Sequence, residues 1–134
     1  MDQHPPPSQA TFHLDGTSGS TTAARHHTED FLAQLHPPLV PATAQDAVLA
    51  VSELVANAVR HAPGPCALDL LWQGGQLVIA VTDTSSAVPV ARAPDLAKGT
   101  GGFGMHLVGR LVAHTTVRTH RDGKTVTVTL NIPT

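Results

Sequence analysis

The stretch SELVANAVRHA, residues 52–62, places polar side chains on a segment that otherwise has the residues of a buried helix. Glu53 and Asn57 are four residues apart, and Arg60 follows three residues later. At about 100° per residue, these side chains share one strip of a helix. A solvated face is one interpretation of that strip, since amphipathic surface helices are common. A ligand lying over the helix is the other.

The helix that contains this stretch is predicted to begin near Ala42 or Thr43 and to end near His61. Its apolar residues recur at the i, i+3, i+4, i+7 spacing of a helix buried on one side. They are Ala44, Ala47, Val48, Val51, Leu54, Val55, Ala58 and Val59. An earlier helix is predicted from Ser20 or Thr21 to Leu35, because the prolines that follow it remove backbone donors.

Two β-hairpins are expected on the C-terminal side of these helices. Residues 67–73 and 76–83 are apolar runs that flank two glycines, which is a strong hairpin signal. Residues 115–120 and 124–132 flank a turn that contains Asp122-Gly123. Because helices and hairpins are grouped along the chain, the order favours an α+β class with helices on one face of a sheet.

The remaining segments complete the predicted order. Residues 11–15 alternate weakly and suit an edge strand, and residues 103–114 predict a short helix. Residues 84–102 form a long segment rich in Pro, Gly, Ser and Ala, as lids and binding loops often are. Residues 1–10 are polar with three consecutive prolines, so we expect a disordered tail before a single domain spanning 11–134.

Composition excludes several classes of protein. The 134 residues suit one domain, and a formal net charge of −2 gives no sign of a nucleic-acid binder. The single cysteine, Cys66, cannot form an intramolecular disulfide. No apolar run approaches the roughly 20 residues that span a bilayer, and MDQHPPPSQA lacks the features of a signal peptide. We therefore expect a soluble cytoplasmic protein that has no membrane partner.

Two further features carry chemistry. Asp83 ends an apolar strand, where a carboxylate either forms an Asx-turn or accepts a hydrogen bond from a ligand. Gly99, Gly101, Gly102 and Gly104 precede and enter an apolar helix. Such a run is either a flexible connector or a place where backbone N–H groups approach an anion. It is neither a P-loop nor a Rossmann fingerprint, because there is no Gly-Lys-Ser/Thr and no strand directly before it.

These motifs together resemble the nucleotide-binding boxes of the GHKL ATPase superfamily. ELVANAVRHA (53–62) is similar to its N box, DTSSAVP (83–89) to its first glycine box, and GFGMHLV (102–108) to its second. DGKTVTVTLNIP (122–133) resembles its closing hairpin, and the likeness covers residues 20–133. The small actinobacterial anti-sigma-factor serine kinases and related histidine-kinase-like ATP-binding regulators are the most similar subgroup.

The resemblance implies a fold and three central residues. The fold is the Bergerat ATP-binding fold, a two-layer α/β sandwich with a mixed, mostly antiparallel sheet and helices on one face. Asn57 would coordinate Mg²⁺ between the ATP phosphates, and its amide oxygen suits that hard cation. Asp83 would accept a hydrogen bond from the adenine amino group. Glu53 would be the catalytic base, polarising a water in ATPases or a serine hydroxyl in kinases.

Further contacts with the nucleotide are implied by the same resemblance. Residues 85–101 would form the ATP lid. The contacts fall on Ser85, Gly102, Gly104, Met105 and Thr125, with the two glycines beside the phosphates. The first glycine box departs from the family pattern, because it contains no glycine and Ser85 stands where one often does.

Three functions are compatible with these features. The first is a protein serine/threonine kinase that transfers the ATP γ-phosphate to a serine of a STAS-type anti-anti-sigma antagonist and binds a sigma factor. The second is an ATP-binding module that sequesters a partner with little or no turnover. The third is an interaction domain without ATP. Glu53 favours the kinase, since a site used only for binding needs no base. The resemblance also allows a homodimer.

Overall fold

The computed structural model describes residues 8–62, 64–84 and 112–132. Within these ranges the elements are β1 (Ser8–Leu14), α1 (Ser20–Ala33), α2 (Pro41–His61), β2 (Cys66–Gln73), β3 (Gln76–Asp83), β4 (Val112–His120) and β5 (Gly123–Asn131). The strands form one sheet in the order β1-β2-β3-β5-β4, and each neighbouring pair is antiparallel.

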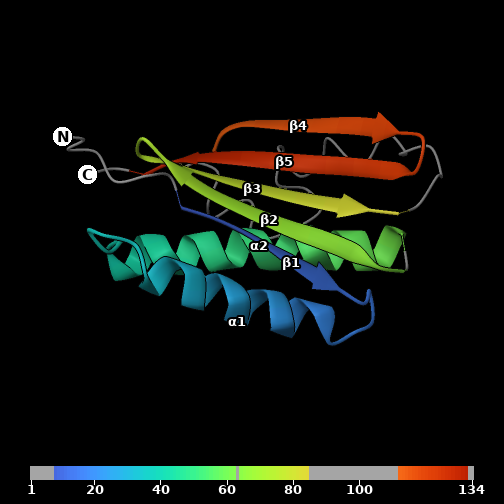
Figure 1. Ribbon diagram of the computed structural model, residues 1–134, viewed down its shortest axis with the longest axis horizontal. Coiled ribbons are helices and arrows are strands. Elements are labelled where there is room, and N and C mark those ends of the chain that lie inside the picture. Colours follow the sequence, from blue (N-terminus) through green and yellow to red (C-terminus); the bar gives the residue numbers. More distant parts are fainter. Residues whose placement is uncertain (1–7, 63, 85–111, 133–134) are drawn as a thin grey trace.

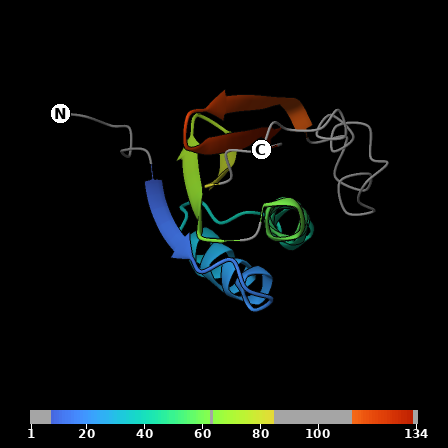
Figure 2. The same cartoon turned by 90° about the vertical axis from the view of Figure 1, so that its right-hand side faces the viewer.

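The two described helices lie on the same side of the sheet (Figure 1). Viewed along the strands, the sheet curves around α1 and α2 (Figure 2). This arrangement confirms the predicted α+β class and its two-layer sandwich. Neither described helix is long and apolar enough to cross a membrane.

The helix predicted around the opening stretch is α2, and its apolar stripe forms the centre of the core. Pro41 stands in its first turn, where the missing backbone donor costs nothing. Its buried residues are Ala47, Ala50, Val51, Leu54, Val55 and Ala58. The sheet supplies the opposite wall with Leu68, Leu70, Leu77, Ile79, Val128 and Leu130. Five of the eight predicted stripe residues of this helix are therefore buried, and the other three pack against the core.

Both predicted hairpins are present. Gly74 and Gly75 join β2 to β3 with φ values of 58° and 82°. Positive φ at both central residues is what a tight hairpin turn requires, and glycine adopts it without a steric penalty. The β4–β5 hairpin turns at Arg121 and Asp122, as the sequence predicts.

Two boundaries differ from the sequence predictions. β1 begins at Ser8, so the last three residues assigned to the tail pair with β2. β4 begins at Val112, inside the helix predicted over 103–114, and a bulge between Val112 and His114 keeps it paired with β5. Short apolar runs do not distinguish strand from helix by periodicity, and a bulge breaks the period of two. The rest of that predicted helix lies outside the described residues.

Gly123 fixes the β4–β5 hairpin against the end of β3. Its φ is 151°, and a Cβ added there would lie 1.9 Å from the backbone oxygen of Asp83. We expect Gly123→Ala to destabilise the protein by about 2 kcal/mol or more, since backbone cannot yield as a side chain does. Thermal unfolding measures the loss. Gly74→Ala is the control, because Gly74 also has a positive φ, of 58°, but its Cβ would meet nothing within 4 Å, so the difference between the two variants measures the clash. Equal melting temperatures for both variants would contradict the prediction.

Candidate functional site

The C-terminal end of α2 and the end of β3 lie at the same end of the sheet (Figure 1). α2 ends at His61, and five residues later Cys66 begins β2 and pairs with Asp83, the last residue of β3. The Thr84 hydroxyl adds a link by donating to the Pro65 carbonyl at 3.2 Å. Asn57 lies one turn before the helix end, so the predicted amide and strand-end carboxylate belong to one end of the fold.

The polar strip on α2 is not uniformly solvated. Glu53 and Asn57 are half-buried, whereas Arg60 is exposed. The Asn57 Nδ2 atom is buried and has no hydrogen-bond partner among the described residues. The nitrogen and oxygen of an amide are assigned from their partners, so either atom can occupy that place. A buried polar group without a partner costs about 1–3 kcal/mol, so this amide is suited to a ligand.

Asp83 is buried on the helix-covered face of the sheet, with 3% of its surface exposed. Alternate residues of β3 on the same face are Leu77, Ile79 and Val81, all buried. Its carboxylate is held from the neighbouring strand: the Lys124 ammonium lies 2.6 Å from Oδ2, and the Lys124 backbone N–H donates to Oδ1 at 3.3 Å. The Asp83 carboxylate is therefore hydrogen-bonded to the neighbouring strand β5, and its role is not only that of an Asx-turn.

Lys124 is the residue at this site that the sequence does not reveal. A lysine directly after an Asp-Gly turn suggests an exposed hairpin position. In the sheet it stands opposite Asp83, and its side chain is only 14% exposed. The signal that could have found it is the register of β3 with β5, since residues directly opposite in an antiparallel pair share a face.

Thr125 lies on the other face of the sheet. It pairs with Thr82, and their hydroxyl oxygens are 2.9 Å apart. The His120 Nε2 atom is 2.6 Å from the same Thr125 oxygen. Because successive side chains of a strand alternate between faces, the structure brings Lys124, and not Thr125, to the face of Asp83.

Several predicted contacts lie outside the described residues. They are Ser85, Gly102, Gly104 and Met105, together with the lid predicted over 85–101. The described part of the candidate site thus consists of Glu53 and Asn57 from α2, Asp83 from β3 and Lys124 from β5.

Cys66 stands opposite Asp83 in the sheet and forms part of the buried wall. Burial raises the pKa of its thiol, and the negative charges of Asp83 and Asp15 raise it further. A thiol with a raised pKa and 5% exposure is a poor nucleophile, so Cys66 contributes packing and not chemistry.

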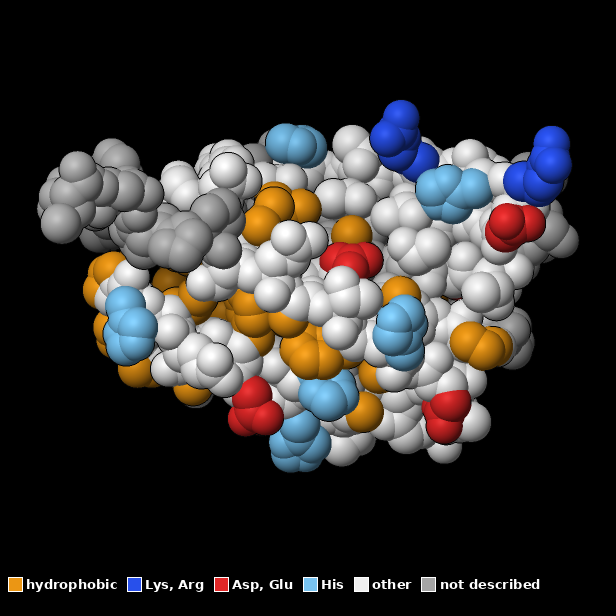
Figure 3. All heavy atoms as spheres, viewed as in Figure 1, with side chains coloured by type: hydrophobic (Ala, Val, Ile, Leu, Met, Phe, Trp, Pro, Cys, Tyr) orange, Lys and Arg blue, Asp and Glu red, His pale blue; other side chains and the backbone are white. Residues whose placement is uncertain are grey.

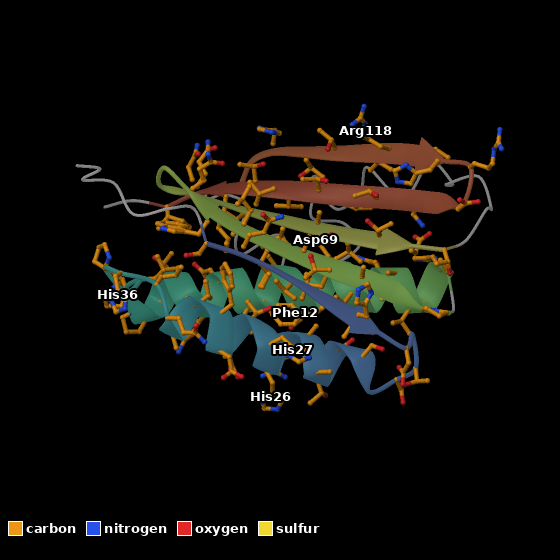
Figure 4. The ribbon with its side chains drawn as sticks, in the orientation of Figure 1. Phe12, His26, His27, His36, Asp69 and Arg118 are labelled. Atoms are coloured by element: carbon orange, nitrogen blue, oxygen red, sulfur yellow. The ribbon has the colours of Figure 1, made fainter. Side chains whose placement is uncertain are left out.

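A separate groove lies between β1 and α1, at the opposite edge of the sheet order from β4. Its volume is about 580 Å³, and its lining includes Phe12, His27 and Asp30. The rings of Phe12 and His27 stack with centroids 4.4 Å apart (Figure 4). Hydrophobic side chains are visible between the strands and the helices on this face of the molecule (Figure 3). None of the predicted nucleotide-site residues lines this groove.

The chain matches the family described as histidine kinase-like ATPase domain over residues 15–130, and it belongs to that family. This confirms the predicted relation to the GHKL ATPase superfamily. Membership in a family of ATPase domains implies that the chain binds ATP. A search of the curated proteins finds no match.

Among solved structures, the chain is similar to the RsbU and RsbW domains of Rv1364c from Mycobacterium tuberculosis. The two share 22% sequence identity with a TM-score of 0.66. The match covers 96% of this chain and 32% of that chain, so this chain spans about a third of the length of the chain it matches. At this level of identity the likeness concerns the fold.

Proposed function

We propose that the chain is a regulator that binds Mg²⁺-ATP where α2 ends beside Asp83. The observation that carries the proposal is the buried Asn57 Nδ2 position, which has no partner among the described residues and lies at the same end of the sheet as the buried Asp83 carboxylate. The amide oxygen of Asn57 suits a hard cation such as Mg²⁺, and the Asp83 carboxylate suits a hydrogen-bond donor on a nucleobase. Membership in a family of ATPase domains supports ATP as the ligand that would use both groups.

Each described residue has a role that its surroundings support. Asp83 accepts a hydrogen bond from the adenine amino group, since an ionised carboxylate offers several acceptor positions. Asn57 supplies the amide oxygen for Mg²⁺, which when bound neutralises phosphate charge and usually keeps several waters. Ser85, Gly102, Gly104 and Met105 remain predicted contacts.

We further propose that the bound nucleotide serves phosphoryl transfer. Glu53 precedes Asn57 by about one helical turn and is half-buried beside it. Phosphoryl transfer needs positioning and charge neutralisation, and a carboxylate near the metal ligand can accept the proton of an attacking hydroxyl. The acceptor would be a serine of a STAS-type antagonist, and a sigma factor would be the second partner. Sequestering a partner without turnover is the alternative that uses the same pocket.

Calorimetric titration with ATP tests the site, with and without Mg²⁺. We expect wild-type protein to bind ATP more tightly with Mg²⁺, and Asn57→Ala to lose about tenfold in affinity only when Mg²⁺ is present. Gln45→Ala is the matched control, since it removes an exposed amide from the same helix. Absence of binding to the wild type would support an interaction domain without ATP. A loss in Asn57→Ala that is the same in EDTA would remove the metal role.

A further inference from the structure

The Asp83–Lys124 pair combines an acceptor and a donor at one point of the helix-covered face. The ammonium lies 2.6 Å from the carboxylate, and both side chains are largely withdrawn from water, with 14% and 3% exposure. The alternate positions along β5 on this face are Val126, Val128 and Leu130, all buried and apolar. Lys124 is thus the one charged residue on this face of β5, and it stands beside the predicted base-binding carboxylate.

An ion pair at this buried position contributes little to stability if its role is only structural. Withdrawing two charges from water carries a desolvation penalty that their mutual attraction often only balances. Apolar residues of similar volume at the same two positions would continue the Val and Leu packing of the strands. The pair therefore suggests a use for its remaining hydrogen-bonding capacity.

That capacity is complementary to one edge of adenine. An ionised carboxylate only accepts hydrogen bonds, and an ammonium has three N–H donors, of which the Asp83 contact uses one. Adenine presents an amino donor at position 6 directly beside an acceptor nitrogen, N1. We propose that Lys124 donates to N1 while Asp83 accepts from the 6-amino group, so that Lys124 is a specificity-determining residue. This inference rests on the proposed ATP site.

The same arrangement disfavours guanine. In the same orientation, guanine places its O6 acceptor against the Asp83 carboxylate and its N1–H donor against the Lys124 ammonium. Both contacts then pair like with like, which leaves buried polar groups unsatisfied. The pair selects adenine both by attraction and by this mismatch.

The test compares ATP with 1-deaza-ATP, in which a C–H replaces the N1 acceptor, on wild type and Lys124→Met. We expect wild type to prefer ATP by about tenfold, as for one lost hydrogen bond to a charged group. Lys124→Met should bind the two nucleotides equally, because the donor is gone. Arg118→Met is the control: Arg118 stands opposite Thr125 on the outer face (Figure 4), so the preference should persist.

The outcomes separate this inference from the proposed function. If wild type binds neither nucleotide, the ATP site itself is wrong. If wild type binds both equally, Lys124 does not contact N1, and this result needs no variant to fold. A preference for ATP that is unchanged in Lys124→Met would make the ion pair structural only. Tighter ATP binding by Lys124→Met would mean that the ammonium competes with the nucleotide for Asp83.

Discussion

Asp83→Asn is expected to lower the affinity for ATP about 100-fold, the upper range for one hydrogen bond to a charged group. The substitution keeps the shape of the side chain but removes its charge. Its amide can turn an NH₂ group toward the adenine amino group, so that donor meets donor. Calorimetric titration with Mg²⁺-ATP measures the loss.

The control for this prediction is Asp69→Asn. Asp69 is also an aspartate within a strand, but it stands opposite Thr11 on the outer face and bonds the Thr11 hydroxyl there (Figure 4). ATP binding by that variant should equal that of wild type. Undiminished binding by Asp83→Asn would exclude the carboxylate from the site.

A loss of binding through unfolding must be separated from a loss of recognition. Asp83→Asn leaves the Lys124 ammonium without the anion that holds it, and a charge so stranded is destabilising. The double variant Asp83→Asn/Lys124→Met removes that charge, so its melting temperature should recover most of the loss. The affinity for ATP should stay as low in the double variant as in Asp83→Asn. Recovery of binding together with stability would show that Asp83 acts only through the fold.

The sequence predicts the fold of this protein well because each signal that decides it is local. The helical period of α2 follows from residues such as Val51, Leu54 and Val55, all of which are buried. The turn residues Gly74 and Gly75 determine the β2–β3 hairpin directly. The sequence signal is weaker for β4, because its start depends on pairing with β5 and not on a regular spacing of apolar residues. The start of β4 at Val112 is accordingly mispredicted as helix.

The candidate site is predicted less completely because its residues come together across neighbouring strands. The sequence reveals Asn57 as part of a polar strip on a helix that is otherwise apolar, and Asp83 as a carboxylate at the end of an apolar strand. Lys124 and Thr125 are adjacent, and only the register of β3 with β5 decides which of them shares a face with Asp83. A shift of this register by one residue would place Thr125, and not Lys124, on the face of Asp83. Register depends on long-range packing, which no local motif contains.

Glu53→Gln is expected to lower phosphoryl transfer by about 10²- to 10⁴-fold, the usual contribution of a general base. Glutamine has the shape of glutamate but cannot take the proton of a serine hydroxyl. ATP binding should remain, because Glu53 is assigned to the acceptor and not to the nucleotide. Incubation with radiolabelled ATP and STAS-type partners measures transfer, while calorimetry measures binding.

The control is Glu29→Gln on α1, since the Glu29 side chain is 52% exposed and its described ion-pair contact is with His26. Its transfer rate should equal that of wild type. If Glu53→Gln transfers phosphate as fast as wild type, Glu53 is not a general base. Catalysis would then come from positioning by the metal and the backbone alone, since phosphoryl transfer needs little help from a base. Wild-type protein that binds ATP and partner but transfers no phosphate would establish the sequestering function instead, because the same pocket then acts only to control binding.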